Sequence, residues 1–167
     1  RDVEGEDPRI GVFVCDCGSN IAGYLDVKEL AEYAKTLPNV VFVRENLYTC
    51  SETGINEIKA AIKEQNLNRV VVASCTPRTH EPLFRGTCAE ADLNPYLFEM
   101  VNIRDQCSWV HMQEREDGTN KAKDLIRMGV AKAALLEPQQ DIQSEVDQRA
   151  MVLGGGISGM TAAMALA

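Results

Sequence analysis

Six cysteines are the residues of this chain with the most distinctive chemistry. They occupy positions 15, 17, 50, 75, 88 and 107, and no two of them form a Cys-x-x-Cys pair. A disulfide framework is typical of small, core-poor proteins in an oxidising compartment, whereas this chain of 167 residues is 45% hydrophobic. We therefore interpret the cysteines as metal ligands or redox thiols, provided that folding brings them together.

The elements that must position the cysteines can be predicted from hydrophobic periodicity. Short β-branched and aromatic runs predict strands at residues 10–14, 40–43, 70–73 and 96–101, the first three of them buried. Amphipathic segments predict helices at residues 26–37, from Ser51 or Thr53 to Ile62, at about 79–91 and at 119–136. Asp26 is expected to cap the first helix, and Pro82 to lie in the first turn of the third.

Strands that alternate with helices indicate a parallel sheet with right-handed crossovers. We expect a three-layer α/β domain with an open, mainly parallel sheet. Four cysteines, Cys17, Cys50, Cys75 and Cys107, each come shortly after a predicted strand. Because the connections that follow parallel strands emerge at one edge of the sheet, these four thiols should meet there.

Four thiolates at one edge can hold an iron-sulfur cluster or a tetrahedral zinc ion. Helices that begin just after Cys50 and Cys75 would stabilise thiolates with their positive amino ends, and Arg78 and Arg104 would add to that field. The lack of close Cys-x-x-Cys pairs favours the cluster over zinc. Free or disulfide-exchanging thiols are a third interpretation.

The remaining cysteines have less certain roles. Cys15 ends a predicted strand, so we expect it to point into the core while Cys17 faces the site, with Cys15 as the substitute ligand or a fifth sulfur. Cys88 lies inside a predicted helix and is interpreted as a small buried hydrophobe. His80 and His111 have no partner spacing and are more typical of surface or capping residues than of catalysts.

A glycine motif stands near the end of the sequence. Gly154, Gly156 and Gly159 fit G-x-G-x-x-G, follow the apolar run at residues 150–153 and open a helical stretch. That context predicts the strand, turn and helix that begin a dinucleotide-binding domain. The expected organisation is an α/β domain at residues 1–136, a polar linker at 137–148 and the beginning of the nucleotide domain at 149–167.

Composition excludes several classes of protein. The formal net charge of -8 disfavours a nucleic-acid partner or an anionic membrane surface. No run approaches the ~18 apolar residues that a membrane span needs, and residues 1–10 have no signal-peptide character. We therefore expect a cytoplasmic protein.

With these residues assembled, the chain resembles the amino-terminal region of the A subunit of heterodisulfide reductase. The segments that carry the resemblance are "VFVCDCGSNIAG", "LYTCSETG", "VVVASCTPRTHEPLFR", "NPYLFEMVNIRDQCSWVH", "AKDLIRMGVAKAALLEP" and "VLGGGISGMTAA". They extend from Ile10 to Ala167, and matches of this length are specific.

The resemblance implies a small α/β domain that binds one four-iron four-sulfur cluster, followed by a thioredoxin-reductase-like domain that binds FAD. It implies partners among the other heterodisulfide reductase subunits and among electron carriers such as ferredoxin or components of hydrogenase and formate dehydrogenase, and it allows a homodimer. It also implies an electron-bifurcating flavin in the longer protein. The 167 residues alone are not expected to bind FAD stably or to turn over.

Two functions from different classes follow. In the first, the chain is an electron-transfer domain whose cluster exchanges single electrons with a flavin. In the second, it is a structural or docking domain whose cysteines hold zinc or remain free. Iron and acid-labile sulfide in the purified protein would separate the two.

Overall fold

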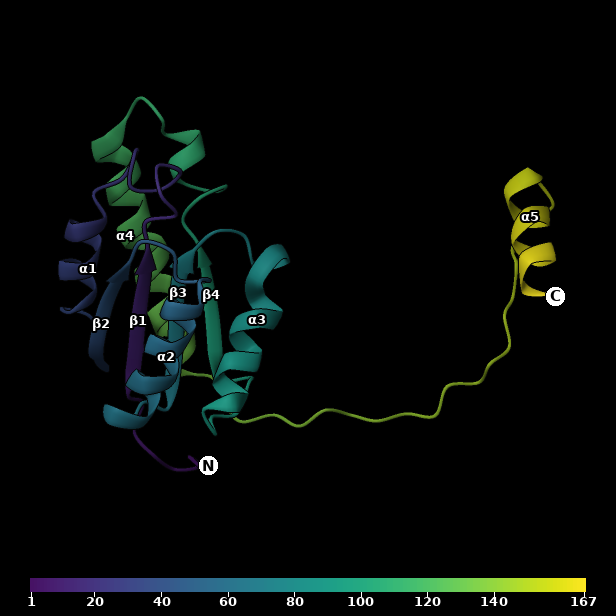
Figure 1. The fold of residues 1–167 in the computed structure, drawn as a ribbon, viewed down its shortest axis with the longest axis horizontal. Coiled ribbons are helices and arrows are strands. Elements are labelled where there is room, and N and C mark those ends of the chain that lie inside the picture. The colour runs from purple at the N-terminus through teal and green to yellow at the C-terminus, as the bar shows by residue number, and fades with distance from the viewer.

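The computed structural model describes all residues, 1–167, and contains one four-stranded parallel sheet (Figure 1). The strands are β1 (Ile10–Cys15), β2 (Val40–Asn46), β3 (Arg69–Ser74) and β4 (Phe98–Asn102). Their order across the sheet is β2-β1-β3-β4, and every neighbouring pair is parallel. The predicted α/β class and parallel sheet are therefore confirmed.

The helices cover both faces of the sheet. They are α1 (Val27–Ala34), α2 (Glu52–Glu64), α3 (Pro77–Glu90), the 3₁₀ turn η1 (Ser108–Val110), α4 (Arg115–Ala134) and α5 (Ile157–Leu166). Helices α1 and α4 pack together behind the sheet, and α2 and α3 pack together in front of it (Figure 1). The result is the expected three-layer arrangement.

Each face of the sheet has its own hydrophobic core, because side chains of a strand point alternately to opposite sides. Val12 and Val14 of β1 belong to the core under α1 and α4. Phe13, between them, belongs to the core under α2 and α3. This alternation decides on which side of the sheet each cysteine lies.

Strand β2 differs from expectation, since we predicted a buried strand and none of its residues is buried. The strand order gives the reason: β2 is an edge strand and pairs only with β1. Its hydrophobic run packs partly against the cores and leaves Val41 exposed. Strands β1 and β3 are buried at every residue, as predicted.

Capping residues set the helix starts. Asp26 accepts a hydrogen bond from the backbone N–H of Glu29, as predicted for the cap of α1, and Ser51 caps α2. The prediction for α3 was wrong at its start: the helix begins at Pro77, so Pro82 lies inside it and not in the first turn. Proline at the first position of a helix costs no hydrogen bond, and Thr76–Pro77 is the signal that fixes this start.

The last 30 or so residues carry a single helix. No helix or strand occupies residues 136–156, so the strand expected at 150–153 is not formed. A strand needs a neighbour for its backbone hydrogen bonds, and none lies beside this segment (Figure 1). Helix α5 does form and begins within the glycine motif, at Ile157. Among the helices of the chain we find none with the length and apolar character that crossing a bilayer requires.

Candidate metal centre

Four cysteines from three connections lie near one another at the carboxyl edge of the sheet. The backbone N–H of Thr49 donates to Sγ of Cys15 at 3.4 Å, which brings the loop before α2 against the end of β1. Burial is the main cause that raises the pKa of the Cys50 thiol, and the charges of Cys15 and Cys17 raise it further. The same two cysteines act on the neighbouring Cys75.

Strand alternation explains why Cys15 takes part in this group. Cys15 is two residues beyond Phe13 on β1, so it points to the α2 and α3 side of the sheet. Cys50 and Cys75 pack against the core on that same side. The sequence-based expectation placed Cys15 in the core behind Cys17; in the structure it is buried, and its Sγ contacts the loop that carries Cys50.

Cys17 is held by an unusual backbone. Its φ of 48° is in the left-handed region, and Gly18 follows with a φ of 56°. A left-handed non-glycine residue costs on the order of 1–3 kcal/mol and tends to mark functional sites. Its positive φ makes Gly18 the favoured residue in this turn after β1, where a Cβ atom would also meet Oη of Tyr48 at 2.7 Å. The turn aims Cys17 across the sheet edge at Arg104.

Arg104 supplies a fixed positive charge beside the thiols. Its Nη1 lies 3.8 Å from Sγ of Cys17, its Nε pairs with Asp105 at 2.9 Å, and its guanidinium stacks on the ring of Trp109 at 4.6 Å. Although burial opposes it, hydrogen bonding to Asp105 and Cys17 raises the pKa of Arg104. The other predicted cation, Arg78, is exposed and makes no ion pair.

Cys107 lies on the same side of the sheet as Cys17, which packs against the same core, and on the opposite side from Cys50 and Cys75. It is buried in the core under α1 and α4. Its Sγ donates to the carbonyl oxygen of Gly118 at 3.1 Å. Burial raises the pKa of its thiol, and the only charge that acts on it is that of Lys121.

The remaining sequence candidates are also placed. Cys88 is buried in α3, and desolvation raises the pKa of its thiol to about 12, which agrees with the role of a small hydrophobe. His111 pairs with Glu114 near the start of α4. All six cysteines are free thiols. Helix α2 begins two residues after Cys50 and α3 two residues after Cys75, so both helices direct their amino ends at the thiols.

Orphaned polar atoms mark the same edge. No three Cys, His, Asp or Glu side chains are arranged around one metal-ion position. Five buried side-chain atoms lack a hydrogen-bond partner, and four of them belong to residues at the carboxyl ends of β1, β2 and β3: Asp16, Asn46, Thr49 and Ser74. Two of the four, in Thr49 and Ser74, are hydroxyls, and the other two are acceptor oxygens. An unpaired buried polar group costs about 1–3 kcal/mol, so this cluster needs an explanation.

Two of these residues, Thr49 and Ser74, were not singled out by sequence reasoning. Each immediately precedes a cysteine of the group, and this position in the sequence could have identified both as neighbours of the site. Burial is the larger effect on the Cys75 thiol and raises its pKa. The Ser74 hydroxyl makes no hydrogen bond of normal geometry, yet it is close enough to Cys75 to lower the pKa of that thiol in part.

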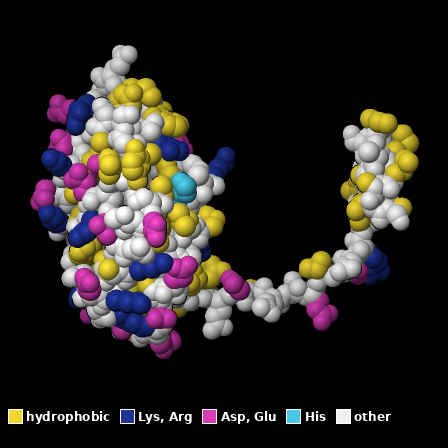
Figure 2. Space-filling view, in the orientation of Figure 1, with side chains coloured by type: hydrophobic (Ala, Val, Ile, Leu, Met, Phe, Trp, Pro, Cys, Tyr) yellow, Lys and Arg dark blue, Asp and Glu magenta, His cyan; other side chains and the backbone are white.

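The donor set fits an inorganic cluster. Thiols can ligate an iron-sulfur cluster, and the nearby guanidinium, two helix amino ends and unpartnered hydroxyls are groups that would stabilise its negative charge. The loops of this edge are also apolar, with the exposed side chains of Leu47, Tyr48, Trp109, Val110 and Met112. Figure 2 shows hydrophobic side chains gathered at the upper end of the domain, above a more charged lower half.

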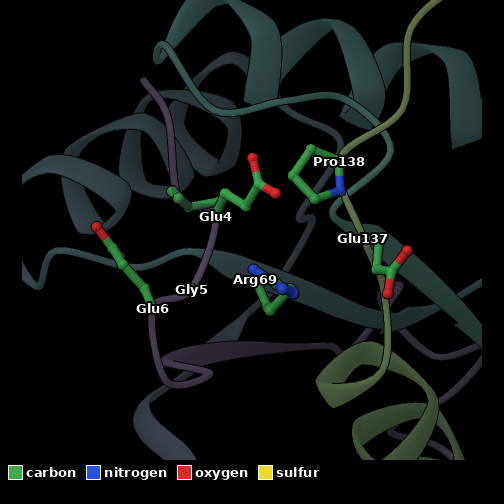
Figure 3. Close-up of a pocket in the computed structure, with 7 residues that line it drawn as sticks. Glu4, Gly5, Glu6, Arg69, Glu137 and Pro138 are labelled. Carbon is green, nitrogen blue, oxygen red and sulfur yellow. The ribbon is translucent and has the colours of Figure 1, made fainter.

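The opposite edge of the sheet has a different character. A pocket of about 330 Å³ lies there, lined by Glu4, Glu6 and Glu137 around Arg69 (Figure 3). Arg69 is only 6% exposed and donates through Nη2 to the carbonyl oxygen of Leu136, two residues after the last residue of α4. The pocket contains no cysteine, and Glu137 and Pro138, where the chain leaves the α/β domain, form part of its lining.

The glycine motif has the backbone geometry of a phosphate-binding turn. Gly154 has a φ of 107°, which favours glycine, and Gly156 is the N-cap of α5 with no side-chain cap. A Cβ atom on Gly159 would lie 2.0 Å from the carbonyl oxygen of Gly154, so the helix can approach the turn only without a side chain there. The positive φ of Gly154 and the close approach at Gly159 are features that the motif requires of its first and third glycines.

Comparison with known proteins points in the same direction. The chain is 59% identical to the iron-sulfur A subunit 2 of the CoB–CoM heterodisulfide reductase of Methanopyrus kandleri, over 97% of this chain and 25% of that protein. It is 56% identical to a protein of Archaeoglobus profundus that is like the A subunit of heterodisulfide reductase, over 97% of this chain and 23% of that protein. The chain is homologous to the amino-terminal part of the heterodisulfide reductase A subunit.

The same subunit recurs among more distant relatives. The A subunit of the ferredoxin:CoB–CoM heterodisulfide reductase of Methanosarcina mazei is 51% identical, over 95% of this chain and 20% of that protein. The chain thus spans a quarter or less of the length of the curated relatives it matches. No family model matches it.

Proposed function

We propose that residues 1–136 form an electron-transfer domain that binds a four-iron four-sulfur cluster, as part of a heterodisulfide reductase-like oxidoreductase. Three ligands would be Cys17, Cys50 and Cys75. The sequence predicts Cys107 as the fourth and offers Cys15 only in place of Cys17 or as a fifth sulfur; the contacts support Cys15 as a candidate for the fourth position as well. Its Sγ accepts a hydrogen bond from the backbone N–H of Thr49, next to Cys50, whereas Sγ of Cys107 donates to the carbonyl oxygen of Gly118 in the core against which Cys17 packs.

The cluster would supply one-electron oxidation and reduction, and the chain's own residues would set the conditions for it. Arg104 and the amino ends of α2 and α3 favour thiolates and a negatively charged group at this edge. The apolar rim around Trp109 and Tyr48 lowers the access of water. An exposed apolar rim of this kind also fits contact with another part of a larger complex.

The remaining segments fit the longer protein of the relatives. Residues 137–148 would be a linker, and residues 149–167 would begin a domain in which Gly154, Gly156 and Gly159 receive the pyrophosphate of FAD. The cluster would relay electrons to or from that flavin, which would be the branch point of electron bifurcation. Names of relatives that contain H₂, ferredoxin and the CoB–CoM heterodisulfide support electron donors and acceptors of these kinds as partners.

The observation that carries the proposal is the group of Cys15, Cys17, Cys50 and Cys75 at one sheet edge, in a chain homologous to subunits named iron-sulfur proteins. The test is anaerobic purification with iron, zinc and acid-labile sulfide analysis and EPR of the reduced protein. About four iron and four sulfide per chain, with a cluster signal, are expected. A colourless chain that keeps its fold with zinc or no metal would instead support the structural or docking function.

The fourth ligand is tested with two matched variants. Cys15→Ser should lower the iron content or change the EPR signal, whereas Cys107→Ser should keep both, because a serine hydroxyl at that position also donates to Gly118. The opposite pattern would assign the fourth position to Cys107. Cys88→Ser serves as the control for a buried cysteine outside the group.

A further inference from the structure

Two buried hydroxyls at the cysteine edge have no partner within the chain. Thr49 is 0% exposed and Ser74 is 2% exposed, and neither Oγ atom makes a hydrogen bond. Buried hydroxyls elsewhere in the domain behave differently. Those of Thr87, Ser108 and Thr119 each donate to a backbone carbonyl oxygen, at 2.7 or 2.8 Å.

The positions of the two hydroxyls are equivalent in the two connections that carry them. Thr49 immediately precedes Cys50, and its backbone N–H already reaches Sγ of Cys15. Ser74 is the last residue of β3 and immediately precedes Cys75. Both residues therefore lie beside cysteines, and a buried hydroxyl there that has no hydrogen bond of normal geometry is placed to donate to a group that the thiols hold.

We propose that the hydroxyls of Thr49 and Ser74 donate hydrogen bonds to sulfur atoms of the bound cluster and raise its reduction potential. This inference rests on the proposed function. Hydrogen bonds to cluster sulfur stabilise the more negatively charged, reduced state, so their loss makes reduction harder. Thr49 and Ser74 are thus positioning residues that tune the cluster and do not ligate it.

The experiment uses the 167-residue chain, purified anaerobically and reconstituted with iron and sulfide. Thr49→Val and Ser74→Ala remove the hydroxyls with little change in shape. Both should keep wild-type iron and sulfide content, and a dye-mediated redox titration should give midpoint potentials more negative than that of wild type. The double variant should shift further than either single variant.

Matched variants separate tuning from structural damage. Thr49→Ser keeps the hydroxyl and should return the wild-type potential. Thr87→Val removes a buried hydroxyl whose hydrogen bond is to Leu83 in α3, so it should leave the potential unchanged. If Thr49→Val loses its cluster, recovery of the cluster in Thr49→Ser supports the hydrogen bond, and no recovery overturns it.

Failure of this inference is distinct from failure of the proposed function. Variants Thr49→Val and Ser74→Ala that hold a complete cluster at the wild-type potential would overturn the inference and leave the cluster in place. A wild-type chain that takes up no iron and sulfide would overturn the proposed function, and the hydroxyl assignment with it.

Discussion

Replacing Thr49 by valine should stabilise the metal-free chain. The hydroxyl is completely buried without a partner, and such a group costs about 1–3 kcal/mol. Valine has nearly the same shape and leaves nothing to satisfy. The free energy of unfolding should therefore rise by about 1–2 kcal/mol, which for a domain of this size raises Tm by roughly 4 °C per kcal/mol.

The assay is urea unfolding of the metal-free chain under anaerobic, reducing conditions, followed by circular dichroism. Thr87→Val is the control: its hydroxyl donates to Leu83 at 2.8 Å, so that change should lower the unfolding free energy by about 0.5–1.5 kcal/mol. The two threonine-to-valine changes thus have opposite expected signs. If Thr49→Val destabilised the metal-free chain as much as Thr87→Val, the hydroxyl would have a partner there, and the reasoning about unpaired polar atoms would be refuted.

Two further predictions concern the core. Gly129→Ala should destabilise the domain by about 1 kcal/mol despite the better helix propensity of alanine, because its Cβ would lie 2.2 Å from a methyl group of Val101. Thermal unfolding measures this change. An unchanged or raised Tm would show that the sheet moves to make room for the new methyl group. Cys88 should resist alkylation in the folded, metal-free chain at mildly alkaline pH, because a pKa of about 12 for its thiol leaves almost no thiolate. The partly exposed Cys17 and Cys50 should react under the same conditions. Peptide mass spectrometry after labelling measures both, and early modification of Cys88 would contradict its burial.

Much of the fold could be predicted because local pattern and topology agree. The runs around Val12 and Val71 indicated buried parallel strands, and alternation with helices indicated the three-layer class. The exposure of Val41 could not be read from its own segment, because strand order across the sheet decides which strand lies at the edge. The pair Thr76–Pro77 signals the start of α3 at Pro77, two residues before the predicted start at about residue 79.

The sequence predicts where in the fold the candidate site lies better than it predicts which cysteines form it. Residues directly after parallel strands meet at one edge, and Cys50 and Cys75 pack there against the same core. The side of the sheet that a loop cysteine takes is set by the path of its connection. For Cys107 that path leads under α4 to Gly118, and for Cys17 it depends on a left-handed turn that no periodicity signals. The hydroxyls of Thr49 and Ser74 became visible only through their missing partners.

The chain leaves the sheet at Leu136, beside Arg69, at the end farthest from the thiols. A six-residue strand such as β1 is about 20 Å long, and residues 137–148 can reach about 40 Å when fully extended. This tether therefore has enough slack to return a following domain along the whole height of the sheet, with roughly half its reach to spare. Its length would therefore set which surfaces of the molecule the proposed flavin domain can reach.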